Sequence, residues 1–67
     1  MPSSAILHEA QQLHNVSDRL DTLADQHPVV SDALAAISGS VRNTATLLEV
    51  LVATKMMPFS GSAPAND

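Results

Sequence analysis

Two rows of apolar residues with the same spacing lie on either side of Pro28, and they constrain the fold of this chain more than any other feature. The first row, whose members lie three or four residues apart, comprises Ile6, Ala10, Leu13, Val16, Leu20 and Leu23. The second row, with the same spacing, comprises Val30, Leu34, Ile37, Val41, Thr44, Leu48 and Leu51. An apolar row with this period indicates an amphipathic α-helix that packs against another helix. The chain is therefore predicted to be all-α.

Pro28 predicts where the two helices meet. A proline disfavours the α-helical region for the residue before it, whereas proline itself is well tolerated in the first turn of a helix. We therefore expect helices at about residues 4–26 and 28–57. A connection this short makes the two helices antiparallel neighbours, so the predicted fold is a helical hairpin. Folding the chain at Pro28 pairs Leu23 with Val30, Leu20 with Leu34, Val16 with Ile37, Leu13 with Val41, and Ile6 with Leu48.

Gly39 offers an alternative fold. A glycine inside a helix costs about 1 kcal/mol relative to alanine, so the second helix would break most easily there. A break at Gly39 would give a three-helix domain. The apolar spacing runs through Gly39 without a change of phase, whereas a loop would normally disturb it. The spacing therefore favours one continuous helix.

The second helix has more apolar residues than one hairpin interface can bury. From residue 44 to residue 57 it is apolar almost all round, and a helix of this kind is normally buried on every side. Chains of this length without disulfides or a metal are commonly stabilised by oligomerisation. We therefore predict a homodimer that forms a four-helix bundle. Its predicted self-association interface comprises Ala36, Gly39, Asn43, Leu47, Val50, Leu51, Thr54 and Met57.

Some of these interface residues have specific expected roles. Ala36 and Gly39 are small, so they would allow two helix backbones to approach closely. Asn43 has two interpretations that the sequence leaves open: a buried polar residue that fixes the register of the dimer, or an exposed polar residue.

Composition excludes several classes of protein. The chain has 67 residues and no cysteine, so a disulfide-stapled module and a cysteine-based zinc site are both excluded. Its net charge is −4, with three basic side chains, so no nucleic-acid partner is expected. We find no signal peptide and no apolar run of the ~20 residues that span a bilayer, and we expect a cytoplasmic protein. Residues 1–57 form the predicted helical domain, and residues 58–67, rich in small and helix-breaking residues, form a predicted flexible tail.

No residue pattern for catalysis or metal binding is found. His8 and His14 lie six residues apart, whereas two metal ligands on one helix need a spacing of three or four, and His27 falls in the predicted turn. None of the serines lies in a nucleophile elbow, and no phosphate-binding glycine loop is present. We therefore expect neither an enzyme nor a protein that holds a metal or a cofactor.

Two functions remain, and both depend on binding another protein chain. The first is a small non-enzymatic protein–protein interaction or oligomerisation module that binds itself and, in addition, another protein. The second is an acidic regulator, resembling an antitoxin or an inhibitor in role, that binds a basic partner protein. Its docking face would comprise Asp18, Asp21 and Asp25, which lie on one side of the first helix.

Overall fold

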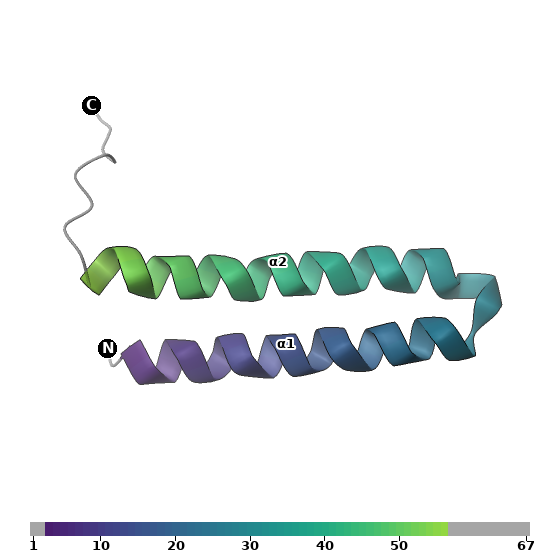
Figure 1. Cartoon of the computed structure of the whole chain (residues 1–67), viewed down its shortest axis with the longest axis horizontal. Helices are drawn as coiled ribbons and strands as arrows, with labels where there is room; N and C mark the ends of the chain where they lie inside the picture. The colour runs from purple at the N-terminus through teal and green to yellow at the C-terminus, as the bar shows by residue number, and fades with distance from the viewer. Residues whose placement is uncertain (1–2, 57–67) are drawn as a thin grey trace, which may run out of the picture.

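Residues 3–56 are described by the computed structural model, in which two antiparallel α-helices lie side by side along their length (Figure 1). Helix α1 spans Ser3–Gln26, the 3-10 turn η1 spans Pro28–Val30, and helix α2 spans Ser31–Met56. The predicted all-α hairpin is confirmed. Met57 and the predicted tail at residues 58–67 lie outside the described residues.

The turn between the helices follows the restriction that Pro28 imposes. His27, with φ of −131° and ψ of 79°, lies outside the helical region, as expected for the residue before a proline. The Val30 amide donates to the His27 carbonyl oxygen at 3.1 Å, and the Ser31 amide donates to the Pro28 carbonyl oxygen. Residues 28–30 therefore form a tight 3-10 turn, and α2 begins three residues later than predicted.

Helix α2 continues through Gly39, so the alternative three-helix domain is not formed. Gly39 does not have a positive φ. A Cβ atom placed on it would meet no other atom within 4 Å. The fold of the single chain therefore has no need of a glycine at this position.

Small residues form the centre of the interface between the helices. The buried residues of α1 are Ala10, Ser17 and Ala24, and those described in α2 are Ser38, Ala45 and Val52; within each helix they lie seven residues apart. Larger side chains flank this line and are half-buried: Ile6, Leu13, Leu20, Leu34, Val41 and Leu48. Small residues in every second layer let the two backbones approach closely, while the flanking leucines cover the sides of the contact.

The predicted apolar rows are therefore wrong in part. The Ser17 hydroxyl bonds to Ser38, so these two residues oppose each other, whereas the predicted register paired Val16 with Ile37. Leu23, Val30, Ile37 and Leu51 were assigned to the contact between the helices, and the structure leaves them 40–53% exposed. Thr44 is also exposed, and Val16 is half-buried. The prediction followed large apolar residues, whereas the helices meet on the neighbouring small ones, which permit the closer approach.

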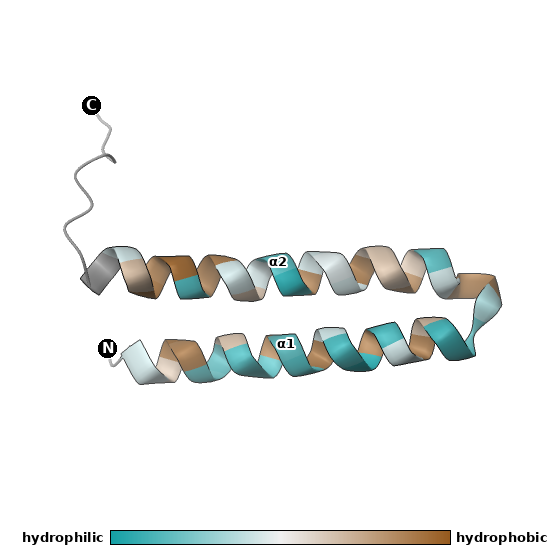
Figure 2. Cartoon of the chain, viewed as in Figure 1, coloured by the Kyte–Doolittle hydropathy of each residue, from teal (hydrophilic) through white to brown (hydrophobic). Residues whose placement is uncertain are grey.

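Apolar character is distributed unevenly between the two helices. Figure 2, coloured by residue hydropathy, shows more hydrophilic residues along α1 and more hydrophobic residues along α2, especially toward its C-terminal end. Neither α1 nor α2, as far as residues 3–56 are concerned, contains a stretch both long enough and apolar enough to span a membrane.

Candidate functional site

The hairpin buries small residues and exposes large apolar ones. Within the described range, its buried hydrophobic residues are three alanines and Val52. The large hydrophobic residues that stay exposed there are Leu7, Leu23, Val29, Val30, Ile37, Leu47, Val50 and Leu51. Folding of the single chain therefore leaves much of its most hydrophobic surface in water, which is unusual unless another surface covers it.

Ile37, Leu47 and Leu51 lie on one side of α2, and Val30 at the end of η1 precedes them. Immediately beside the line of buried residues runs a second row with alternating spacings of three and four, which we call the exposed seam. The exposed seam comprises Val30, Ala33, Ile37, Ser40, Thr44, Leu47, Leu51 and Thr54. All of these residues are exposed except Thr54, which is half-buried. None carries a charge, so α2 presents a second helix-packing surface beside the one that it uses within the chain.

Helix α1 extends this apolar surface sideways. Leu23 and Val16 each immediately precede a buried residue of α1, just as Val30 and Ile37 precede the interface positions Ser31 and Ser38 of α2. In an antiparallel pair of right-handed helices, residues that precede the contact on both helices lie along the same edge. Leu23, which is 40% exposed, therefore adjoins the exposed seam.

The opposite edge of the hairpin is polar. The Arg42 guanidinium donates to the Asp21 carboxylate at 2.7 Å, and His14 Nε2 lies 3.3 Å from a carboxylate oxygen of Glu49. These two contacts lie one heptad apart on both helices. All four side chains are partly exposed, so water screens the pairs and their main effect is to select the register of the helices. One edge thus pairs its polar groups within the chain, and the other leaves apolar groups unpaired.

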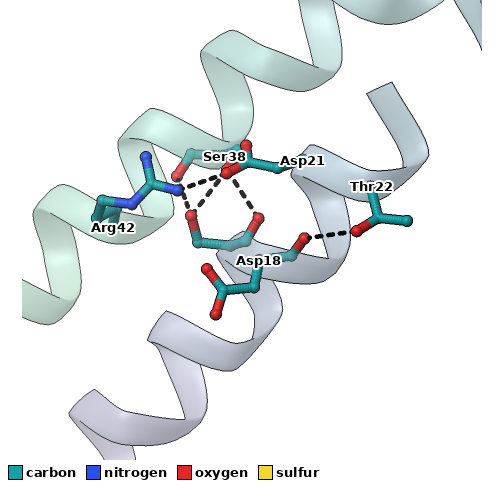
Figure 3. A network of polar contacts seen from close by, with 6 residues as sticks. Asp18, Asp21, Thr22, Ser38 and Arg42 are labelled. Atoms are coloured by element: carbon teal, nitrogen blue, oxygen red, sulfur yellow. Dashed lines mark hydrogen bonds and ion pairs between the residues drawn. The ribbon is translucent and has the colours of Figure 1, made fainter. Parts of the chain in front are cut away.

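A buried serine pair connects the helices between these edges (Figure 3). The Ser17 and Ser38 hydroxyl oxygens lie 2.7 Å apart, and neither residue is accessible to solvent. The Ser17 hydroxyl donates to the Ser38 carbonyl oxygen at 3.1 Å, and the Ser38 hydroxyl donates to the Ser17 carbonyl oxygen at 2.9 Å. Both hydroxyls are thus engaged in packing, and neither faces a cavity where it could act as a nucleophile. Sequence reasoning missed this pair, although the seven-residue spacing of serine and alanine was a signal that could have found it.

The predicted acidic face is divided by the fold. Asp18 and Asp25 are exposed on the outer side of α1, whereas Asp21 lies at the polar edge and contacts Arg42. Ser38 and the Arg42 guanidinium hold the pKa of the Asp21 carboxyl below its ordinary value, and desolvation opposes them. Asp21 is thus paired with Arg42 within the chain, which leaves Asp18 and Asp25 for a basic partner.

The predicted self-association residues fall on two adjacent strips of α2. Leu47, Leu51 and Thr54 belong to the exposed seam. Outside the seam, on the outer side of the helix, the exposed residues are Ala36, Gly39, Asn43 and Val50. Asn43 is exposed in the single chain, and Met57 lies outside the described residues.

The described residues were searched for pockets and for clusters of metal-binding side chains. No pocket is found in the hairpin, and no three histidine or acidic side chains of residues 3–56 converge as metal ligands. His8 instead contacts the Gln12 amide at 3.3 Å on the exposed side of α1. Comparison of the chain with models of protein families, with curated proteins and with solved structures finds no match.

Proposed function

We propose that this hairpin is a non-enzymatic protein–protein interaction module that associates with a second copy of itself into a four-helix bundle. The observation that supports the proposal is the inverted distribution of apolar residues. Among the described residues, the buried positions between the helices are mostly alanine and serine, flanked by half-buried leucine, isoleucine and valine, and further leucine, isoleucine and valine residues line one exposed edge. A second hairpin on that edge would give these side chains the burial that the single chain does not provide.

The magnitude of this effect suits reversible association. The five large residues of the apolar edge are Leu23, Val30, Ile37, Leu47 and Leu51, and each is 40–58% exposed. Full burial of such a side chain stabilises by about 1.5–3 kcal/mol, so covering the exposed half contributes about 1 kcal/mol. Two copies would gain about 10 kcal/mol, which is comparable to the ~4–15 kcal/mol that association costs. The dimer is therefore expected to dissociate within an accessible range of concentration.

A dilution series tests the proposal. Light scattering should give the mass of two chains at high concentration, and the midpoint of thermal unfolding, followed by circular dichroism, should fall on dilution. The mass of one chain at every concentration, together with a constant midpoint, would refute self-association.

A pair of matched variants locates the contact. Leu47→Asp places a charge on the apolar edge and should convert the dimer to a monomer. Asn15→Asp introduces the same residue on the outer side of α1, where Asn15 is exposed, and should leave the dimer intact. Equal loss of the dimer in both variants would show that added negative charge, rather than the apolar edge, is responsible.

The acidic-regulator function is kept as the second candidate because Asp18 and Asp25 are exposed and pair with no other described side chain. The double variant Asp18→Asn/Asp25→Asn separates the two functions. It should leave the mass of the dimer unchanged if the apolar edge mediates association. If these aspartates instead bind a basic partner, the variant should lose salt-sensitive binding to polylysine, used as a model of a basic surface.

A further inference from the structure

The exposed seam has the spacing of a helix-packing surface, which restricts the shape of what can cover it. Alternating steps of three and four residues continue from Val30 to Thr54, beside a contact of the same period within the chain. A surface of this kind fits the side of another α-helix, because knobs of one helix enter the holes of the other at this spacing. At ~1.5 Å per residue the seam is about 36 Å long, which is enough for six or seven turns of a partner helix.

The distribution of charge indicates which partner helix covers the exposed seam. The chain has a net charge of −4, so two copies repel each other wherever charged faces meet. The exposed seam contains no charged residue, and the residues of α1 that adjoin it are Glu9, Val16 and Leu23, of which only Glu9 is charged. Two copies that meet along the seam therefore bring no like charges together within the seam itself. A strongly basic partner would gain nothing there, since its attraction is to Asp18 and Asp25 on the far side of α1.

We infer that the partner of the exposed seam is the exposed seam of a second copy, with the two α2 helices antiparallel. This inference rests on the proposed self-association and assigns its geometry. A two-fold interface requires that if one residue contacts another, the reciprocal contact also occurs. The seam contains two sets of residues, and within each set the spacing is seven. When two seams pack antiparallel, each set lies opposite the other set of the partner helix, which satisfies this condition.

The register follows from the length of the seam. If Ile37 lies opposite Leu47 of the second copy, Ser40 lies opposite Thr44, and the symmetry axis passes between these two positions. Every residue of the exposed seam then has a partner, whereas a shift of one heptad in either direction leaves residues at the ends unmatched. The same register places Leu51 opposite Ala33, so that a large side chain meets a small one, and two hydroxyl-bearing residues lie at the centre.

The assignment divides the predicted self-association residues into two groups. Leu47, Leu51 and Thr54 lie within the contact. The residues on the outer side of α2, such as Gly39 and Asn43, lie beside it.

Disulfide cross-linking tests this geometry directly, because the chain has no cysteine of its own. Two single variants, Ile37→Cys and Leu47→Cys, are prepared separately, checked for helicity and mass, and oxidised either alone or as a mixture. The mixture should give a covalent dimer that contains one chain of each, several-fold more abundant than the covalent dimer from either variant alone. A second pair, Ala33→Cys mixed with Leu51→Cys, repeats the test at another point of the seam, where one of the two replaced residues is small. Gly39→Cys mixed with Thr46→Cys is the matched control on the outer side of α2.

Each outcome distinguishes the inference from the proposed function. Efficient cross-linking of Ile37→Cys with itself would show parallel helices and would overturn the inference. Cross-linking confined to the Gly39 and Thr46 control would place the contact on the outer side of α2 and would also overturn it. A dimeric mass with no cross-link at either seam pair would overturn this geometry and leave the proposed self-association standing. A monomeric mass at all concentrations would refute both.

Discussion

Removal of the buried serine pair should show strong non-additivity in the free energy of unfolding. Ser17 and Ser38 have two hydroxyl protons between them, yet they make three contacts: two to main-chain carbonyls and one between the hydroxyl oxygens. Replacing either serine by alanine removes its own donated bond and the 2.7 Å contact between the hydroxyl oxygens, so the other hydroxyl stays buried with only its bond to a main-chain carbonyl oxygen. A net hydrogen bond contributes about 1 kcal/mol, and the higher helix propensity of alanine returns about half of that. Each single variant should therefore be destabilised by about 0.5–1 kcal/mol.

The double variant should be close to the wild type instead of twice as unstable. With both hydroxyls gone, the layer becomes a pair of alanines that resembles the neighbouring layers at Ala10, Ala24 and Ala45, and no side-chain polar group stays buried. Replacing both partners of a buried hydrogen bond by apolar groups of similar shape is nearly neutral. The coupling energy from the cycle is therefore expected to be about 1–2 kcal/mol, and helix propensity cancels from it.

Chemical denaturation followed by circular dichroism, at one fixed chain concentration, measures all four proteins. A double variant whose loss equals the sum of the two single losses would show that the serines act independently, and it would refute this account of the pair.

Three further changes test other parts of the structure. Gly39→Ala should stabilise the chain by about 0.5–1 kcal/mol in thermal unfolding and leave the dimer mass unchanged, because the added Cβ meets open space; a weakened dimer would place Gly39 in the interface. Ala45→Leu should destabilise by about 1–3 kcal/mol because Ala45 is fully buried, whereas Ala53→Leu on the exposed side should change unfolding little. Since Ser38 and Arg42 lower the pKa of Asp21 in the folded chain, its contribution to stability is present above the ordinary aspartate pKa and is lost as the pH falls through the folded value. The Asp21→Asn variant should accordingly lose less stability than the wild type between neutral and acid pH.

The fold was predictable from the sequence because two strong local signals agree. The helical period of the apolar residues and the restriction imposed by Pro28 both require two antiparallel helices, and the observed bounds differ from the predicted ones by at most three residues. The continuity of α2 through Gly39 was also correctly predicted, because an unbroken apolar period is a stronger signal than the propensity of one glycine.

Which residues form the contact between the helices was less predictable. High hydrophobicity favours the large apolar residues at this contact, whereas close approach of the backbones favours small ones. Large apolar residues at Ile37 and Leu51 were assigned to the contact, whereas Ser38 and Val52, one position further along, are buried. Serine and alanine are weak signals of burial when each is taken alone. Their repetition every seventh residue is informative only when both helices are compared, since close approach requires small residues on both sides.

This difference of one position between the predicted and the observed contact explains why the candidate site could be predicted only in part from the sequence. The sequence placed Leu47 outside the interior row, and the structure leaves it exposed, whereas Val30, Ile37 and Leu51 had been assigned to the interior. Moving the interior contact by one position frees these three residues and aligns them with Leu47 in a continuous uncharged row. The row could not be recognised before the helix–helix register was known.

The small residues at the interface link the stability of the hairpin to its association. The layers of alanine and serine remove less apolar area from water than layers of leucine would, so the single chain gains less hydrophobic stabilisation than a hairpin of equal length with leucine in every layer. Several large side chains lie on the apolar edge, where they stabilise the chain further only when a second surface covers them. Fixing the helix-forming residues in one conformation carries the same entropic cost in either state. Association therefore supplies stabilisation that the isolated hairpin lacks, and folding and binding are expected to respond together to dilution and to any charge placed on the exposed seam.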